Sequence, residues 1–167
     1  MRRFRAATFS GLLAVALPGQ ATAAGCLLET AVYAQKESGY VLRFRPSHEL
    51  VRFSGTTNVF FVEAPDLKKP LTGWVIWNLG ESRPGGRAML DCPEDGMTED
   101  DFADCTLWQG VVYALGERDA NLLPGEDEAA PETILLPDFG RQIRYSLVVD
   151  IGAEEVPWDV FRLKGCE

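Results

Sequence analysis

The sequence has a single histidine, His48, and this scarcity excludes most familiar hydrolase arrangements. Ser47 is a poor partner, because adjacent side chains of an extended segment point to opposite faces. No serine lies in a G-x-S-x-G elbow. An H-E-x-x-H zinc site would need a second histidine. We therefore assign no catalytic residue and expect a non-enzymatic protein.

The sequence also lacks closely spaced cysteines, because no two of the four are separated by the two to four residues that structural zinc sites favour. The absence of C-x-x-C likewise argues against disulfide exchange. An even number of cysteines is typical of an oxidising compartment. Three pairings are possible in principle, and the chain positions favour Cys26 with Cys166 and Cys92 with Cys105.

A run of about 18 apolar residues is missing too, so we predict no transmembrane segment. The longest apolar stretch, residues 9–17, follows three arginines and precedes the small residues 21–24. This order is typical of a secretory signal peptide. We expect residues 1–24 to be a cleaved signal peptide and residues 25–167 to be one exported domain, periplasmic or extracellular.

Basic residues are few, with 16 Lys and Arg against 25 Asp and Glu, a net charge of −9. Loss of the signal peptide would remove three arginines and leave 13 against 25, a net charge of −12. A surface this acidic repels phosphate backbones and attracts cations or basic proteins. We therefore expect no nucleic-acid partner.

Alternation of apolar and polar residues indicates strands at intervals along the chain. It is clearest at residues 142–150 and recurs at 27–34, 40–45, 50–53 and 58–63. Turn residues such as Pro, Gly and Asp separate these segments. The pattern predicts an all-β domain, an antiparallel two-sheet β-sandwich, with a β-barrel as the alternative.

Four further segments depart from simple alternation. Residues 73–79 are apolar on both faces, which predicts a strand covered on both sides. Residues 107–115 also fit helical spacing, but Gly110 and two adjacent valines favour a strand. Thr98, followed by three carboxylates, predicts one short helix within 98–105. The long segment 116–131 shows no periodicity and predicts a loop.

Acidic residues gather in two segments, and we consider them candidates for interaction. The EF-hand spacing is not met, because counting from Asp91 places Pro93 at the third position and Phe102 at the twelfth. We assign no metal ligand and no cofactor. The candidate interaction residues are Glu94, Asp95, Glu99, Asp100, Asp101, Asp104, Glu126, Asp127 and Glu128.

These observations favour an exported, non-enzymatic domain that recognises a basic protein or an envelope component through its acidic loops. One alternative is a carbohydrate-active hydrolase with paired carboxylates, for which Glu81 is the first candidate. Another is a passive structural protein of the envelope. Six aromatic residues could form a sugar-stacking surface, although we expect them mainly in the core: Trp74, Trp77, Trp108, Trp158, Tyr113 and Tyr145.

Overall fold

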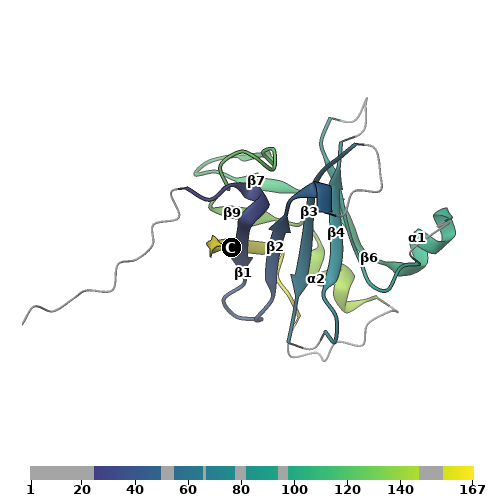
Figure 1. The fold of residues 1–167 in the computed structure, drawn as a ribbon. Helices are drawn as coiled ribbons and strands as arrows, with labels where there is room; N and C mark the ends of the chain where they lie inside the picture. The colour runs from purple at the N-terminus through teal and green to yellow at the C-terminus, as the bar shows by residue number, and fades with distance from the viewer. Residues whose placement is uncertain (1–24, 50–54, 66, 78–81, 94–97, 147–155) are drawn as a thin grey trace, which may run out of the picture.

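The structure is a computed structural model that describes residues 25–49, 55–65, 67–77, 82–93, 98–146 and 156–167. The predicted signal peptide and the predicted strand at 50–53 lie outside the described residues. The described chain is mostly β-structure, with ten antiparallel strands in one sheet and two helices (Figure 1).

The strand bounds are β1 Ala31–Ala34, β2 Val41–Arg45, β3 Thr56–Glu63, β4 Leu71–Ile76, β5 Gly85–Met89, β6 Thr106–Val111, β7 Tyr113–Leu115, β8 Ala120–Leu122, β9 Thr133–Leu135 and β10 Val160–Cys166. The helices are α1 Glu99–Cys105 and α2 Phe139–Arg144, and two 3₁₀ turns are η1 Leu28–Thr30 and η2 Ser47–Glu49. The strands lie in the order β6-β5-β4-β3-β2-β1-β10-β9-β7-β8.

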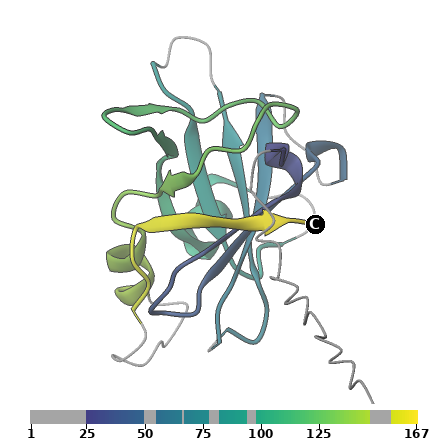
Figure 2. The same cartoon turned by 90° about the vertical axis from the view of Figure 1, so that its left-hand side faces the viewer.

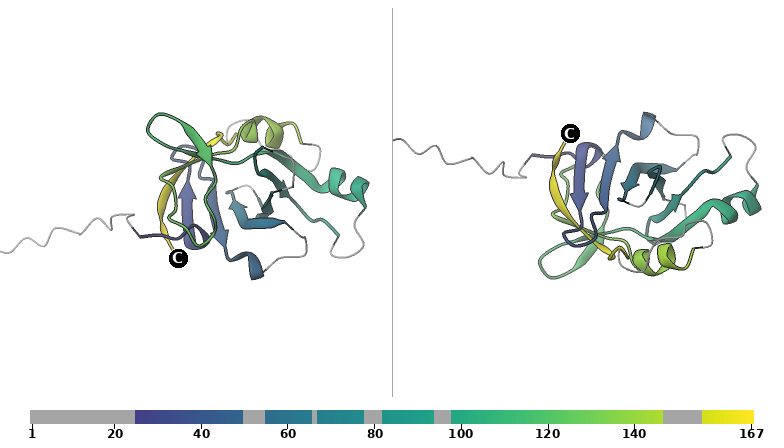
Figure 3. Two further views of the ribbon diagram at one scale, coloured as in Figure 1. Left: turned by 90° about the horizontal axis from the view of Figure 1, so that it is seen from above. Right: turned by 90° about the horizontal axis from the view of Figure 1, so that it is seen from below.

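The predicted two-sheet sandwich is wrong, because the strands form one sheet that curls as a half-barrel (Figure 3). The reason lies in residues 106–115. Strand β6 pairs with β5 at one end of the sheet, and β7 pairs with β9 near the other end. Only Val112 separates β6 from β7, so the sheet must curl for one segment to serve both ends. The alternation of apolar and polar residues does not distinguish the two architectures, because a strand buries one face in a sandwich and in a half-barrel alike.

Aromatic rings fill the concave side of the sheet. The ring of Phe139, from α2, contacts Tyr40, Trp108 and Phe161 with ring centroids 5.6–6.4 Å apart. All four side chains are fully buried. Helix α2 therefore closes this part of the curled sheet with an aromatic side chain.

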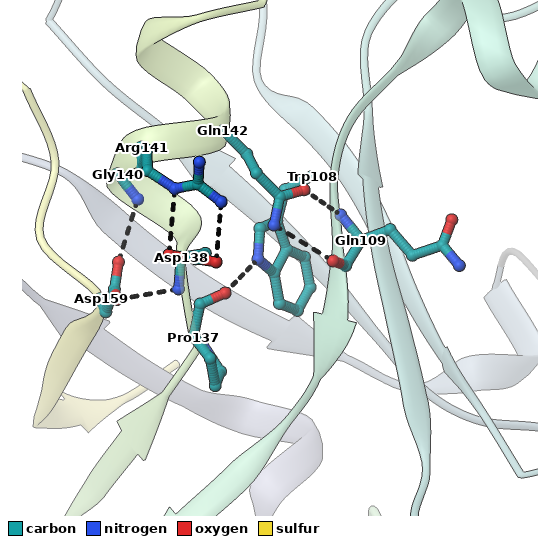
Figure 4. Close-up of polar contacts among 8 residues, drawn as sticks. All are labelled: Trp108, Gln109, Pro137, Asp138, Gly140, Arg141, Gln142 and Asp159. Carbon is teal, nitrogen blue, oxygen red and sulfur yellow. Dashed lines mark hydrogen bonds and ion pairs between the residues drawn. The ribbon is translucent and has the colours of Figure 1, made fainter.

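The predicted strand at 142–150 is wrong in its described part, because residues 142–144 belong to α2 and residues 147–150 lie outside the described residues. The carboxylate of Asp159 accepts hydrogen bonds from the backbone N–H groups of Asp138 at 2.8 Å and Gly140 at 3.1 Å (Figure 4). These bonds satisfy N–H groups that a helix start leaves unpaired. A distant side chain therefore stabilises a helix where local alternation favours a strand.

Other segments agree with the sequence predictions fully or in part. The segments at 40–45 and 58–63 contain β2 and most of β3, and the short helix is α1. Residues 27–34 contain η1 as well as β1, and residues 107–115 are strand except at Val112. The predicted loop at 116–131 is wrong in part, because it includes β8.

Two disulfides link the cysteines as predicted. Cys26 pairs with Cys166 with Cα atoms 5.6 Å apart, and Cys92 pairs with Cys105 at 5.2 Å. The first bond links the described N-terminal end to the end of β10, which runs across the sheet between β1 and β9 (Figure 2). The second links the end of α1 to the segment after β5.

Candidate functional site

Helix α1 begins with a reciprocal cap. The Thr98 hydroxyl accepts a hydrogen bond from Asp101 N at 3.2 Å, and the Asp101 carboxylate accepts from Thr98 N at 2.8 Å. The backbone bond from Thr98, reinforced by its hydroxyl, lowers the pKa of Asp101 below its ordinary value. This predicted interaction residue therefore has a local structural role. With the disulfide at Cys105, the short helix is fixed at both ends.

The remaining acidic residues of α1 are on its surface. Asp100 and Asp104 are one turn apart and lie on one side of the helix. A different side lines a groove and consists of Glu99, Phe102 and Ala103. Asp100, Asp104 and Glu99 are all exposed, and none of them forms an ion pair within the described ranges. Helix α1 stands out at the end of the molecule opposite the C-terminus (Figures 1 and 3).

The second acidic cluster, residues 126–128, is bound to the rest of the fold. The Glu126 carboxylate accepts hydrogen bonds from Ser47 N at 2.7 Å and Ser47 Oγ at 3.0 Å. The Glu128 carboxylate accepts from Gly125 N at 2.7 Å. Asp127 is exposed. Glu126 therefore links this segment to η2, and Glu128 stabilises the segment itself.

The predicted interaction residues Glu94 and Asp95 lie outside the described residues, as does Glu81, the candidate for a hydrolase. His48 is exposed in η2. In the part of the chain that the structure describes, no three His, Cys, Asp or Glu side chains converge as a metal site would require. No described helix has the length and apolar character to span a bilayer.

A groove that sequence reasoning missed lies between α1 and the outer face of strands β4, β5 and β6. Its floor consists of outward-facing rows that cross the three strands in register. Trp74, Arg87 and Gln109 form one row. Ile76, Gly85 and Val111 form the next. The groove is open to solvent, has a volume of about 1140 Å³ and is named the β5 groove below.

Side chains of α1 form the wall of the β5 groove. The Phe102 ring meets the Trp74 ring edge to face, with centroids 6.0 Å apart and planes at 89°. The Arg87 guanidinium lies 5.8 Å from the Phe102 ring centroid. Phe102 therefore covers Trp74 and holds Arg87. This agrees in part with the prediction that both faces of the strand within 73–79 are covered, because Phe102 covers Trp74, whereas Ile76 lines the open groove and Trp77 is exposed.

The predicted aromatic residues have different locations. Trp108 is buried, and Trp74 and Tyr113 are half-buried. Trp77, Trp158 and Tyr145 are exposed, with 41%, 65% and 72% of their surface accessible. Two sequence features could have suggested the β5 groove, namely Trp74 and the short helix between Cys92 and Thr106. No sequence feature indicated that Arg87 lines it.

Comparison with protein-family models, with curated proteins and with solved structures finds no match for the chain. Glu99 is the one carboxylate among the described residues that line the β5 groove, whereas a paired-carboxylate hydrolase needs two across one cleft.

Proposed function

We propose that this chain is an exported, non-enzymatic recognition domain that binds a basic protein through the exposed acidic side of α1. The observation behind the proposal is the pair Asp100 and Asp104, one turn apart on a helix that a cap and a disulfide fix in place. Fixed charges at the rim of an interface speed association with a partner of opposite charge. The excess of acidic residues over the whole chain adds long-range attraction.

Two observations support export. Residues 1–24 have the order of charged, apolar and small residues that signal peptides show. The two disulfides are of the kind that persists in oxidising compartments such as the periplasm or the extracellular space.

The test measures binding of lysozyme, a basic protein, to the immobilised protein without residues 1–24, at increasing salt concentrations. We expect the dissociation constant to rise as the salt concentration increases, because salt screens the charges. The double variant Asp100→Asn/Asp104→Asn should weaken binding about threefold to tenfold, because rim charges contribute modestly.

The matched control is Glu117→Gln/Asp119→Asn, which changes the same net charge at two exposed residues before β8. It should leave binding within about twofold. Salt-insensitive failure to bind would reject the proposal. Equal effects of the two double variants would also reject it, because net charge alone would then explain binding.

A further inference from the structure

The two arginines of the β5 groove are held by aromatic rings. Arg87 lies over Phe102, as described above. Arg83 Nη1 donates a hydrogen bond to the Tyr113 hydroxyl at 3.0 Å, and its guanidinium lies 5.8 Å from that ring's centroid. A ring covers one face of a guanidinium and leaves N–H donors along its edge. Each arginine is therefore oriented and still able to bind an acceptor.

The charge of the β5 groove differs from that of the chain. The chain has 25 acidic residues, yet neither Arg83 nor Arg87 forms an ion pair in the described ranges. The described lining of the groove includes two guanidiniums and one carboxylate, Glu99. Guanidinium groups bind carboxylates with two parallel hydrogen bonds. The groove is therefore complementary to anionic groups, and carboxylates are the ones that a peptide segment carries.

The spacing of the outward residues suggests the shape of this ligand. Pro84 and Gly86 are buried, whereas Arg83, Gly85 and Arg87 are at least partly exposed. Within β5, alternate residues such as Gly85 and Arg87 are about 6.7 Å apart, and Arg83 lies at a bend two residues before the strand begins. An extended peptide that lies along β5 has its own alternate side chains at the strand spacing, so one carboxylate can meet Arg87 and a second, beyond the start of β5, can extend toward Arg83, which lies against Tyr113.

Gly85 leaves an opening between these arginines. A β-carbon placed on Gly85 would have no other atom within 4 Å. Ile76 and Val111 are its register partners on either side and provide apolar contacts. An apolar side chain between the two acids of a peptide would therefore fit this opening and bury apolar surface.

We propose that the β5 groove binds an extended peptide segment with the pattern acid-x-apolar-x-acid. The acids pair with Arg83 and Arg87, and the apolar residue occupies the space over Gly85. The aliphatic side chains beside Gly85 favour a peptide over an acidic polysaccharide. The β5 groove does not include Asp100 or Asp104, so peptide binding and lysozyme binding are tested independently of each other.

The test measures binding of fluorescein-labelled Glu-Ser-Leu-Ser-Glu to the exported protein, with both peptide ends blocked. The reference peptide is Gln-Ser-Leu-Ser-Gln. We expect the acidic peptide to bind about tenfold more tightly or better, because charge-assisted hydrogen bonds are the stronger ones. Arg83→Gln/Arg87→Gln should abolish this preference. Arg118→Gln/Arg144→Gln, with the same net charge at two exposed arginines outside the groove, should retain it.

A second variant tests the opening without removing charge. Gly85→Leu should fill the space and weaken binding about tenfold, with an unchanged melting temperature. Gly165→Leu is the matched control, since it lies on β10 and also has open space beside its Cα, and it should bind as the parent does. Equal binding of the two peptides would overturn the proposal. It would also be overturned if oligogalacturonate bound more tightly than the acidic peptide and lost binding in Arg83→Gln/Arg87→Gln.

Discussion

The side-chain amide of Gln142 pairs with the main chain of Gln109 as a neighbouring strand would. Its Oε1 accepts from Gln109 N at 3.0 Å, and its Nε2 donates to Gln109 O at 3.2 Å (Figure 4). Strand β6 is at one end of the sheet order, where backbone groups have no further strand to bind. One side chain from α2 therefore occupies part of that edge. Gln35 makes the same kind of paired contact with the backbone of Trp158.

We expect Gln142→Leu to lower the free energy of unfolding by about 1–2 kcal/mol, because it removes two hydrogen bonds. Urea denaturation measures the change, and amide exchange at Gln109 reports it locally. Gln109→Ala is the control. It removes an exposed side chain and keeps the bonded backbone, so stability should change by less than about 0.5 kcal/mol. A larger loss in Gln109→Ala than in Gln142→Leu would contradict this account.

Gly73 lies against an aromatic ring on the inner face of β4. A β-carbon there would lie 2.2 Å from Phe60 Cε2 and 2.8 Å from the Arg87 carbonyl oxygen. We expect Gly73→Ala to lower the unfolding free energy by about 1–3 kcal/mol through overpacking. Gly85→Ala, on the next strand, has open space and should change it little. Thermal unfolding compares the two variants.

A double-mutant cycle tests the cause. If the Phe60 ring is the obstacle, Phe60→Leu should cost less in the Gly73→Ala background than in the parent. Additive effects would show that the Arg87 carbonyl, or the backbone itself, produces the loss.

Short-range patterns in the sequence identified the elements whose sequence signal is local. Leu42 and Phe44 alternate with polar residues in β2, and both are buried. Thr98 and Asp101 form the cap of α1 within three residues of each other. The disulfides followed from chain positions. In each case the sequence signal lies in neighbouring residues or in the cysteines, even where, as in β2, the strand pairs with residues farther along the chain.

The features missed depend on contacts between distant residues. Helix α2 begins where Asp159 binds its first N–H groups, and these residues are 19 and 21 positions apart. Gly85 and Gly86 resemble a turn, yet they belong to β5 because β4 and β6 pair on both sides. The curled sheet follows from the two pairings of residues 106–115. The floor of the β5 groove depends on the pairing of β5 with β4 and β6, so local patterns could point to its aromatic wall but not to Arg87.

The two disulfides should stabilise different parts of the protein. Cys26 and Cys166 are 140 positions apart, so a chain-entropy estimate gives about 5 kcal/mol for their bond, against about 3 kcal/mol for the 13-position separation of Cys92 and Cys105. We expect Cys26→Ser/Cys166→Ser to lower the melting temperature more. Cys92→Ser/Cys105→Ser should weaken lysozyme binding more, because it frees the end of α1. The reverse order in either measurement would contradict this assignment.

The cap of α1 makes the helix sensitive to acid. Hydrogen bonds from the backbone and hydroxyl of Thr98 lower the pKa of Asp101 in the folded protein. A lowered folded pKa means that the carboxylate stabilises the helix above the ordinary aspartate value of about 3.9, and that this contribution is lost as pH falls through the folded pKa. Carbon chemical shifts of α1 should therefore move toward coil values below about pH 4. Asp101→Asn should remove this transition, whereas Asp100→Asn should retain it. An Asp101 carboxyl that titrates at or above about 3.9 would show that the cap does not hold in solution.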